Sequence, residues 1–572
     1  MTENRETHVE FNNFYFKYKS QVDFSLFDIN LNIKKGEKLV IVGPSGSGKS
    51  TLAKSFNGQI PNTYPGDMEG FCLIDGKNIE NSSIFDLSLQ TGTVLQDTDG
   101  QFVGLTVAED IAFSLENDNV NQKDMEKIVH KWAEILKIEK LLEKKPNELS
   151  GGQKQSVSIA GVLVSEVPLL LLDEPLANLD PKSGRSTMKL LKDLAEKLDI
   201  SIVVIEHRLE EALLLDPDRV IVVSDGKIIG DMSPTELLKS DILEKIGIRK
   251  PLYIDALTYA RANLSSYEKL SDFSYVDIKE IDLEKVEAWA VEKPRNIVEK
   301  SGENILKIEN LSFAYEKERV LDGINLEIDK GEMISIVGPN GAGKSTLAKL
   351  ICGFLRPDSG KIFINGNETR NLSIKEIADR VGFILQNPNA MISKTKIFDE
   401  VAFGLRLRGL DEKEIEEKVY ETLKICGLYP FRNWPISALS YGQKRRVTIA
   451  SILVLDPEIL ILDEPTAGQD FRHYTKMMEF IRLLNKDHGL TILMISHDMH
   501  LIEEYTDRSI VVCDKKILAD MSPAELFSNE ELIDMANLSQ TSLYKLGKKL
   551  KNISPLDFIE AFIGYERSLR DE

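Results

Sequence analysis

Short runs of apolar residues recur along the chain, and each ends at glycine or at polar residues. The runs 39–42, 169–172 and 202–205 have counterparts at 334–337, 460–462 and 491–495. Apolar runs of this length bounded by turn signals are typical of buried strands. The stretches 121–145 and 411–428 have a helical pattern instead. The alternation of the two patterns predicts an α/β protein.

The whole pattern occurs twice along the chain. Gly43 and Gly338 lie 295 positions apart, whereas the matches from Gln96 with Gln386 to His207 with His497 lie 290 apart. The heptapeptide Asp-Met-Ser-Pro-x-Glu-Leu recurs as well, from Asp231 and from Asp520. A period this long indicates two copies of a complete domain rather than a solenoid repeat. We expect domains at 8–245 and 303–540, a linker at 246–302 and a helical tail at 541–572.

A glycine-rich nonapeptide follows the first apolar run of each copy and precedes a helix. The two nonapeptides are Gly43, Pro44, Ser45, Gly46, Ser47, Gly48, Lys49, Ser50 and Thr51, and Gly338, Pro339, Asn340, Gly341, Ala342, Gly343, Lys344, Ser345 and Thr346. Backbone N–H groups of such a loop converge on phosphate oxygens, the lysine reaches the β and γ phosphates, and the serine can ligate Mg²⁺. The sequence therefore predicts two phosphate-binding loops.

Polar residues stand at the ends of the other predicted strands. Each copy has a glutamine (Gln96; Gln386), a serine at an expected helix N-cap (Ser150; Ser440), an Asp-Glu-Pro triplet (Asp173 and Glu174; Asp463 and Glu464) and a histidine (His207; His497). A lone histidine or glutamine at such a place is more often structural or solvated. Recurrence at identical spacing favours a functional role.

Alternating aromatic residues open each copy and predict a strand, with Phe14, Phe16 and Tyr18 in the first copy and Phe313 and Tyr315 in the second. Tyr18 and Tyr315 either stack on an adenine ring or are ordinary half-buried strand residues, and spacing alone leaves both open.

Composition narrows the function further. The formal net charge of −21 opposes general adhesion to nucleic acid or to anionic lipid. The four cysteines are scattered, so we expect small core residues in a reducing cytoplasm rather than disulfides or metal ligands. Neither a signal peptide nor an apolar run of the roughly 18 residues needed to span a bilayer is present, so any membrane contact is expected through a protein partner.

The order of these motifs, including Leu-Ser-Gly-Gly-Gln from Leu149 and Leu-Ser-Tyr-Gly-Gln from Leu439, resembles the ATP-binding cassette (ABC) ATPases over nearly all of both halves. The resemblance implies two P-loop NTPase domains, each with a mixed sheet core and a helical subdomain. In that family two cassettes pair head to tail. One site would join the first phosphate loop, Gln96, Asp173, Glu174 and His207 with Ser440 and Gly442; the other would join the second loop, Gln386, Asp463, Glu464 and His497 with Ser150, Gly151 and Gly152.

The resemblance also implies the roles of these residues in ATP hydrolysis. Mg²⁺ would be held by Ser50 or Ser345 with Asp173 or Asp463, and sensed by Gln96 or Gln386. Glu174 and Glu464 would orient and deprotonate water, and His207 and His497 would donate to the γ-phosphate. Tyr441 departs from the family pattern because it replaces glycine. We expect unequal sites, with the one that uses Ser440 closing less readily.

The stretch after Gln96, Gln-Asp-Thr-Asp-Gly-Gln-Phe-Val, is similar to the energy-coupling-factor and cobalt-type importer ATPases, and fused chains of this kind are similar to ATPases proposed for hydroxymethylpyrimidine or thiamine uptake. This implies a transmembrane coupling subunit, docked beside Gln96 and Gln386, and a separate substrate-binding membrane subunit for a vitamin, a vitamin precursor or a metal ion.

Three alternatives remain open at this stage. A soluble tandem-cassette factor on the ribosome would have a long basic linker, whereas the linker here is mildly acidic. A DNA-repair ATPase would carry zinc-ligand clusters or coiled-coil heptads, and this sequence shows neither. A fused sugar-importer ATPase is disfavoured by the two intact glutamates and the Gln-Phe-Val stretch.

Overall fold

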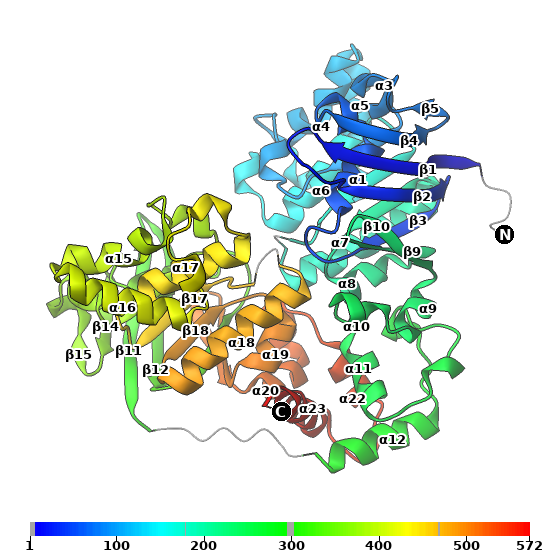
Figure 1. Cartoon of the computed structure of the whole chain (residues 1–572). Coiled ribbons are helices and arrows are strands. Elements are labelled where there is room, and N and C mark those ends of the chain that lie inside the picture. Colours follow the sequence, from blue (N-terminus) through cyan, green and yellow to red (C-terminus); the bar gives the residue numbers. More distant parts are fainter. Residues whose placement is uncertain (1–5, 178, 294–301, 467–468, 572) are drawn as a thin grey trace. The chain divides into compact units, whose positions relative to one another are not determined.

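The computed structural model describes residues 6–177, 179–293, 302–466 and 469–571, and its contacts divide the chain into two units (Figure 1). The first unit comprises Met1–Trp289 with Gly468–Arg472, and the second comprises Ala290–Ala467 with His473–Glu572. Both units have the same architecture, so the duplication read from the sequence is a duplication of fold.

Two sheets form the centre of the first unit. The six-stranded sheet has the order β10-β9-β3-β8-β7-β6 and is parallel except for the pair β9 and β10. Its strands are β3 (Lys38–Val42), β6 (Thr91–Val94), β7 (Leu169–Asp173), β8 (Ser201–Ile205), β9 (Arg219–Ser224) and β10 (Lys227–Met232). An antiparallel sheet of order β2-β1-β4-β5 contains β1 (Thr7–Tyr18), β2 (Leu26–Lys34), β4 (Gly66–Ile74) and β5 (Lys77–Asn78).

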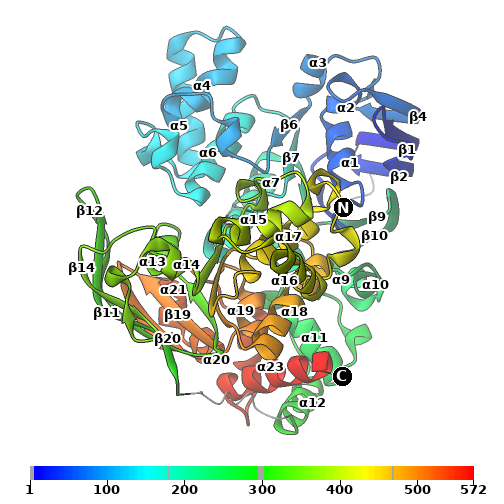
Figure 2. The same cartoon turned by 60° about the vertical axis from the view of Figure 1, so that its left-hand side comes forward.

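Helices of the first unit cover these sheets and form a separate cluster. They are α1 (Lys49–Phe56), α2 (Gln59–Asn62), α3 (Ile84–Ser88), α4 (Val107–Asn117), α5 (Gln122–Leu136), α6 (Gly151–Leu163), α7 (Pro181–Leu198), α8 (Leu209–Ala212), α9 (Pro234–Lys239), α10 (Ile242–Ile246), α11 (Leu252–Tyr259) and α12 (Glu280–Val291). Helices α4, α5 and α6 pack on one another and lie apart from β1 and β4 (Figure 2). This cluster is the helical subdomain that the resemblance implies.

The second unit repeats the two sheets. A mixed sheet of order β16-β17-β18-β13-β19-β20 contains β13 (Met333–Val337), β16 (Val381–Ile384), β17 (Ile459–Asp463), β18 (Thr491–Ile495), β19 (Arg508–Cys513) and β20 (Lys516–Met521). The antiparallel sheet β12-β11-β14-β15 contains β11 (Asn304–Tyr315), β12 (Glu318–Asp329), β14 (Ser359–Ile364) and β15 (Asn367–Glu368).

Helices of the second unit follow the same order as those of the first, except that α2 has no counterpart among the described residues. They are α13 (Lys344–Ile351), α14 (Ile374–Ala378), α15 (Ile397–Arg408), α16 (Glu412–Ile425), α17 (Tyr441–Leu453), α18 (Phe471–His488), α19 (Met499–Tyr505), α20 (Pro523–Ser528), α21 (Glu530–Met535), α22 (Ser542–Gly547) and α23 (Pro555–Asp571). Helices α15, α16 and α17 form the second helical subdomain.

The apolar runs of the sequence are the central strands, as predicted. All residues of Ser201–Ile205 and all four leucines of β7 are buried, because helices and the antiparallel sheet cover the two faces of the parallel strands. On β1, Phe14 and Phe16 are buried and alternate with more exposed residues, which confirms the strand predicted from the aromatic spacing.

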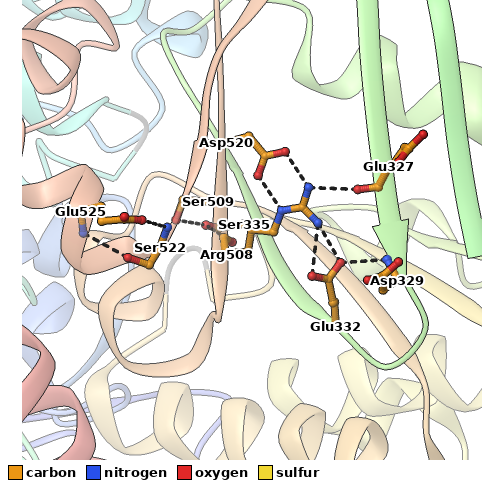
Figure 3. Close-up of polar contacts among 9 residues, drawn as sticks. All are labelled: Glu327, Asp329, Glu332, Ser335, Arg508, Ser509, Asp520, Ser522 and Glu525. Atoms are coloured by element: carbon orange, nitrogen blue, oxygen red, sulfur yellow. Dashed lines mark hydrogen bonds and ion pairs between the residues drawn. The ribbon is translucent and has the colours of Figure 1, made fainter. Parts of the chain in front are cut away.

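The repeated heptapeptide has a structural role in both units. In the second unit, Arg508 donates to both carboxylate oxygens of Asp520 (2.5 and 2.6 Å) and to Glu332 (2.9 Å), as Figure 3 shows. Ser522 caps α20 through a reciprocal pair of hydrogen bonds with Glu525. Arg219, Glu37 and Asp231 form the same arrangement in the first unit. The heptapeptide therefore joins the edge of the mixed sheet to the next helix and is not part of the functional site.

The expected linker is folded over much of its length. In the part that the structure describes, Asp282 is 1% exposed and accepts hydrogen bonds from Tyr267 Oη (2.8 Å) and from the ammonium of Lys285 (2.9 Å). Residues 294–301 of this linker lie outside the described residues. At the other end of the chain, α23 packs on α19, α20 and α22. Among the described residues, no helix is both long enough and apolar enough to cross a bilayer.

Candidate functional site

Each glycine-rich nonapeptide is a loop between a buried strand and a helix, as predicted. In the first unit it joins β3 to α1, and in the second it joins β13 to α13. A side chain at Gly43 would meet the carbonyl oxygen of Val223, so only glycine lets the loop leave the strand here. Gly48 has a left-handed backbone (φ 104°) at the N-cap of α1, which leaves the first helical N–H groups free of a side-chain cap. Such N–H groups form an anion site.

The lysine of each loop is folded back into the loop. Lys49 Nζ donates to the carbonyl oxygens of Gly43 and Pro44, both at 2.8 Å, and Lys344 does the same with Gly338 (2.8 Å) and Pro339 (2.9 Å). Burial lowers the pKa of Lys49 to about 8. The ammonium is therefore poorly solvated, and a phosphate group offers it a stronger partner than two carbonyl groups do.

The two aspartates lie at the ends of β7 and β17, next to their phosphate loops. Ser345 Oγ donates to Asp463 Oδ2 at 3.2 Å. Burial raises the pKa of Asp463 and raises that of Asp173 to about 6, and among the described residues Asp173 Oδ1 is buried without a hydrogen-bond partner. The serine hydroxyl beside the carboxylate in the second unit, and the carboxylate oxygen without a partner in the first, are both suitable for a hard cation such as Mg²⁺, which would complete its shell with phosphate and water.

Glu174 is the centre of a hydrogen-bonded cluster in the first unit. It has a left-handed backbone (φ 49°), and its N–H donates to the carbonyl of Ile205. Gln96 Nε2 donates to Glu174 Oε2 at 2.6 Å, and His207 Nε2 lies 2.8 Å from Glu174 Oε1. Burial alone would raise the pKa of Glu174, but His207, Lys49 and Gln96 together hold it below its usual value. The carboxylate is thus kept ionised and oriented, as a general base requires.

Glu464 occupies the same place in the second unit but has different surroundings. Its Oε1 atom lies 3.5 Å from His497 Nε2, beyond the 2.8 Å of the first unit. The structure records no bond from the Gln386 side chain to this carboxylate among the described residues. Burial and the neighbouring Asp463 raise the pKa of Glu464 to about 8. The two glutamates are therefore not equivalent.

A cavity of about 1390 Å³ in the first unit brings the predicted residues together. Its lining includes Lys49, Gln96, Glu174 and His207 at one part and Tyr18 with Phe24 at another. Polar groups and aromatic side chains around one cavity suit a nucleotide, which has a charged and an aromatic end.

The two tyrosines proposed as adenine platforms differ in their packing. Tyr18 is partly buried and its hydroxyl donates to Thr51 Oγ1 (3.2 Å) at the end of the phosphate loop. Tyr315 is 44% exposed and contacts Phe313 edge to face. Stacking on adenine stays a prediction for both.

The predicted helix caps are confirmed. Ser150 and Ser440 are the N-caps of α6 and α17, each in a reciprocal capping box with the glutamine three residues later. Gly151, Gly152 and Gly442 lie in the first turns of these helices. The pairing of each helix with the phosphate loop of the other half stays a prediction.

Sequence reasoning missed Arg445, which is buried in the second unit beside Gln386 and Glu464. The signal was available, because the equivalent position of the first half holds Gln155 and such a change of charge beside a repeated motif is unusual.

Comparison with known proteins gives two family matches. The family described as "ABC transporter" matches residues 26–177 and 321–467, and the family described as "ATP-binding cassette cobalt transporter" matches residues 240–313. The second match covers the whole segment 246–302 that was expected as a linker.

Relatives match over almost the whole chain. A putative ABC transporter ATP-binding protein of Enterococcus faecalis is 55% identical over 98% of this chain and 99% of its own length. Proteins with the same description from Lactobacillus johnsonii and Clostridium perfringens are 51% and 49% identical, over 98% and 99% of this chain and 98% and 100% of their own lengths.

Among solved structures, CbiO1 from Clostridium perfringens, described as part of the ABC transporter complex CbiONQ, is 34% identical with a TM-score of 0.38, over 41% of this chain and 95% of that chain. The family match over both halves and the full-length relatives settle the classification. This chain is an ATPase that belongs to the ATP-binding proteins of ABC transporters.

Proposed function

We propose that this ATPase is the energy-coupling subunit of an energy-coupling-factor type importer for a vitamin, a vitamin precursor or a metal ion. The observation that carries the proposal is the cluster of Lys49, Gln96, Glu174 and His207 around one cavity of the first unit, in a chain that also matches the cobalt-transporter family at 240–313. The same residue types recur in the second half as Lys344, Gln386, Glu464 and His497. The family match favours import of a small nutrient over the ribosomal alternative, which the comparisons do not support.

Hydrolysis in each site needs an aligned water and offset phosphate charge. Glu174 accepts the proton of the attacking water, Gln96 holds the carboxylate at 2.6 Å, and His207 donates to the γ-phosphate. In the second site Glu464 accepts the proton and His497 donates to the γ-phosphate, whereas the Gln386 side chain makes no recorded bond to the Glu464 carboxylate among the described residues. Ser50 and Ser345, with Asp173 and Asp463 and the two glutamines, would hold Mg²⁺, which neutralises charge between the phosphates. Lys49 and Lys344 add positive charge at the same oxygens.

In this scheme each nucleotide-binding site is completed by residues from the opposite half of the chain. The first phosphate loop binds with Ser440 and Gly442, and the second binds with Ser150, Gly151 and Gly152. ATP then draws the two domains together, and hydrolysis lets them part. The repeated capping boxes are compatible with this assignment, because each serine hydroxyl accepts the N–H of the third helical residue and leaves those of the first two uncapped.

A membrane-embedded coupling subunit is the partner that moves with the domains. Large apolar side chains stand exposed in the segment that follows Gln96 in the chain, above all Val103 (61%) and Leu105 (79%), and Leu407 (73%) is exposed on α15 of the second unit. Exposed apolar side chains in a protein of net charge −21 mark a protein interface rather than contact with anionic lipid. The ATPase would thus be peripheral, on the cytoplasmic face of the membrane, and a separate membrane subunit would bind the substrate.

Purification of the tagged full-length chain from detergent-solubilised membranes tests the proposal. We expect hydrophobic membrane proteins to co-purify, and mass spectrometry of the bound small molecule to identify a vitamin, its precursor or a metal ion. Leu105→Asp should abolish co-purification while ATP turnover of the isolated chain stays within about twofold, whereas Lys127→Ala, at an exposed lysine of α5, should retain the partners. Recovery of ribosomal particles instead would contradict the importer assignment.

Transport supplies the second test. The double variant Lys49→Ala with Lys344→Ala should lose ATP-driven uptake into cells or proteoliposomes, because both phosphate loops lose their ammonium group. Uptake by this variant at the wild-type rate would exclude the scheme.

A further inference from the structure

Arg445 is buried in the second unit, although its guanidinium group is charged. Its side chain is 1% exposed and projects from the second turn of α17, the helix that begins at the Leu-Ser-Tyr-Gly-Gln motif. One guanidinium nitrogen, Nη2, donates both to the carbonyl oxygen of Gln386 (3.0 Å) and to that of Glu464 (2.6 Å). A single side chain thus connects the motif helix, the glutamine loop and the loop that carries the catalytic glutamate.

Tyr441 adds a second connection from the same helix. It lies one turn before Arg445, on the same face, and its hydroxyl donates to the carbonyl oxygen of Gln386 at 3.3 Å. The residue that departs from the glycine of the family motif therefore has a partner within its own unit. Two donors on α17 converge on one main-chain oxygen.

We propose that Arg445, supported by Tyr441, is a positioning residue for ATP hydrolysis in the second unit. It fixes the main chain at Gln386 and Glu464, so that both side chains start from a defined place beside the phosphate loop. The proposal depends on the ATPase activity of the family and not on the identity of the transported substrate.

The backbone at Glu464 shows why such a fixed point matters. Glu464 has φ 47°, in the left-handed region that residues other than glycine rarely adopt. Its N–H donates to the carbonyl oxygen of Ile495. Arg445 binds the carbonyl on the other side of the same residue. The strained backbone of Glu464 is therefore held on both sides. Among the described residues the Gln386 side chain makes no recorded bond to the Glu464 carboxylate, so the backbone sets the direction of this carboxylate.

The first unit achieves the same result by a different route. Gly151 and Gln155 occupy the positions of Tyr441 and Arg445, and Gln155 is 3% exposed with an Nε2 atom that has no partner among the described residues. There the Gln96 side chain binds the carboxylate of Glu174 directly. The duplicated halves thus use a side-chain contact in one site and a main-chain contact in the other.

Steady-state kinetics of the full-length chain test this inference. Each variant is made in two backgrounds. In a Glu174→Gln parent, turnover reports the second site alone. The wild-type chain serves as the other background because turnover could require both glutamates. Arg445→Gln should lower kcat about tenfold with KM for ATP within about threefold, because misplaced catalytic groups slow the chemical step more than they weaken binding. Arg445→Lys, which keeps one charged donor, should recover part of the lost kcat.

Folding is controlled by measuring thermal unfolding and by assaying well below each Tm. Gln155→Leu in a Glu464→Gln parent and in the wild-type chain is the matched control, and its kcat should stay within about twofold. If Arg445→Gln does not fold, Arg445→Lys and Tyr441→Phe carry the test, with an expected loss of about twofold or more in kcat. A kcat within twofold of the parent in all folded Arg445 and Tyr441 variants, or a rise in KM with unchanged kcat, would overturn the proposal.

Discussion

His207 Nε2 and Glu174 Oε1 lie 2.8 Å apart in the first unit, whereas the equivalent atoms of His497 and Glu464 lie 3.5 Å apart in the second. The difference has an electrostatic consequence. A nearby histidine and glutamine favour the charged form of Glu174. Burial and a neighbouring carboxylate disfavour the charged form of Glu464. We therefore expect the two glutamates to lose their protons in different pH ranges.

The first prediction is a difference in pH dependence. In a Glu174→Gln chain the remaining base is Glu464, with a pKa of about 8, so turnover should rise as the pH increases from 6.5 to 8.5 and the carboxyl group loses its proton. In a Glu464→Gln chain the remaining base is Glu174, whose pKa is below its usual value, so turnover should stay nearly constant over this range. Steady-state phosphate release at saturating ATP measures both, and parallel profiles would count against the difference.

The second prediction concerns the size of the two effects. At pH 7 most Glu464 carboxyl groups are protonated, whereas Glu174 is ionised, so Glu174→Gln should remove more of the wild-type turnover than Glu464→Gln. The site that contains Glu174 is also the one that uses Ser440. If Tyr441 slows the closure of this site, as expected from the sequence, Glu174→Gln would remove less of the turnover, which is the opposite order. A larger loss in Glu464→Gln than in Glu174→Gln would favour the Tyr441 expectation instead, and equal losses in phosphate release would contradict the order predicted here from the pKa values.

The phosphate loops, the strand-end carboxylates and the helix caps were predictable from the sequence because each depends on local chemistry. A loop such as 43–51 needs glycine where the backbone is left-handed, and Ser150 with Gln153 forms a capping box within four residues. These requirements are short-range, and so their residues stand together in the chain.

Long-range contacts set the rest and could not be predicted. The bond from Arg445 to Gln386 joins residues 59 positions apart. The change from Gln155 to Arg445 between the two copies marks the residue in the sequence but does not identify its partner. The contrast between Glu174 and Glu464 depends on differences in side-chain placement within identical motifs. The segment around Asp282 is polar enough to suggest an exposed linker, yet its charges pair with one another and with Tyr267 over a packed interior.

The third prediction concerns stability of the second unit. Arg508 pairs with Glu332 and Asp520 in a site where the arginine side chain is 16% and that of Glu332 is 9% exposed. Arg508→Ala leaves the two carboxylates partly buried without their partner, and the free energy of unfolding should fall by about 3 kcal/mol. Arg319→Ala, which breaks the exposed pair of Arg319 with Asp322, should change it by less than about 1 kcal/mol. Denaturant unfolding followed by a probe in the second unit measures both, and equal effects would refute the role given to the Arg508 cluster.

The fourth prediction follows from the buried ammonium of Lys49. Because burial lowers its pKa to about 8, this lysine loses its proton in the free enzyme as the pH rises above 8. ATP prefers the charged form, so the Kd of the first site should be about tenfold weaker at pH 9 than at pH 7. Calorimetry on a Lys344→Ala chain, in which only the first loop keeps its lysine, measures this change. Lys49→Arg in the same chain is the matched control, since arginine stays charged over this range and its Kd should vary little with pH. A Kd that is independent of pH in the lysine form would show that the charge of Lys49 is not what the phosphate recognises.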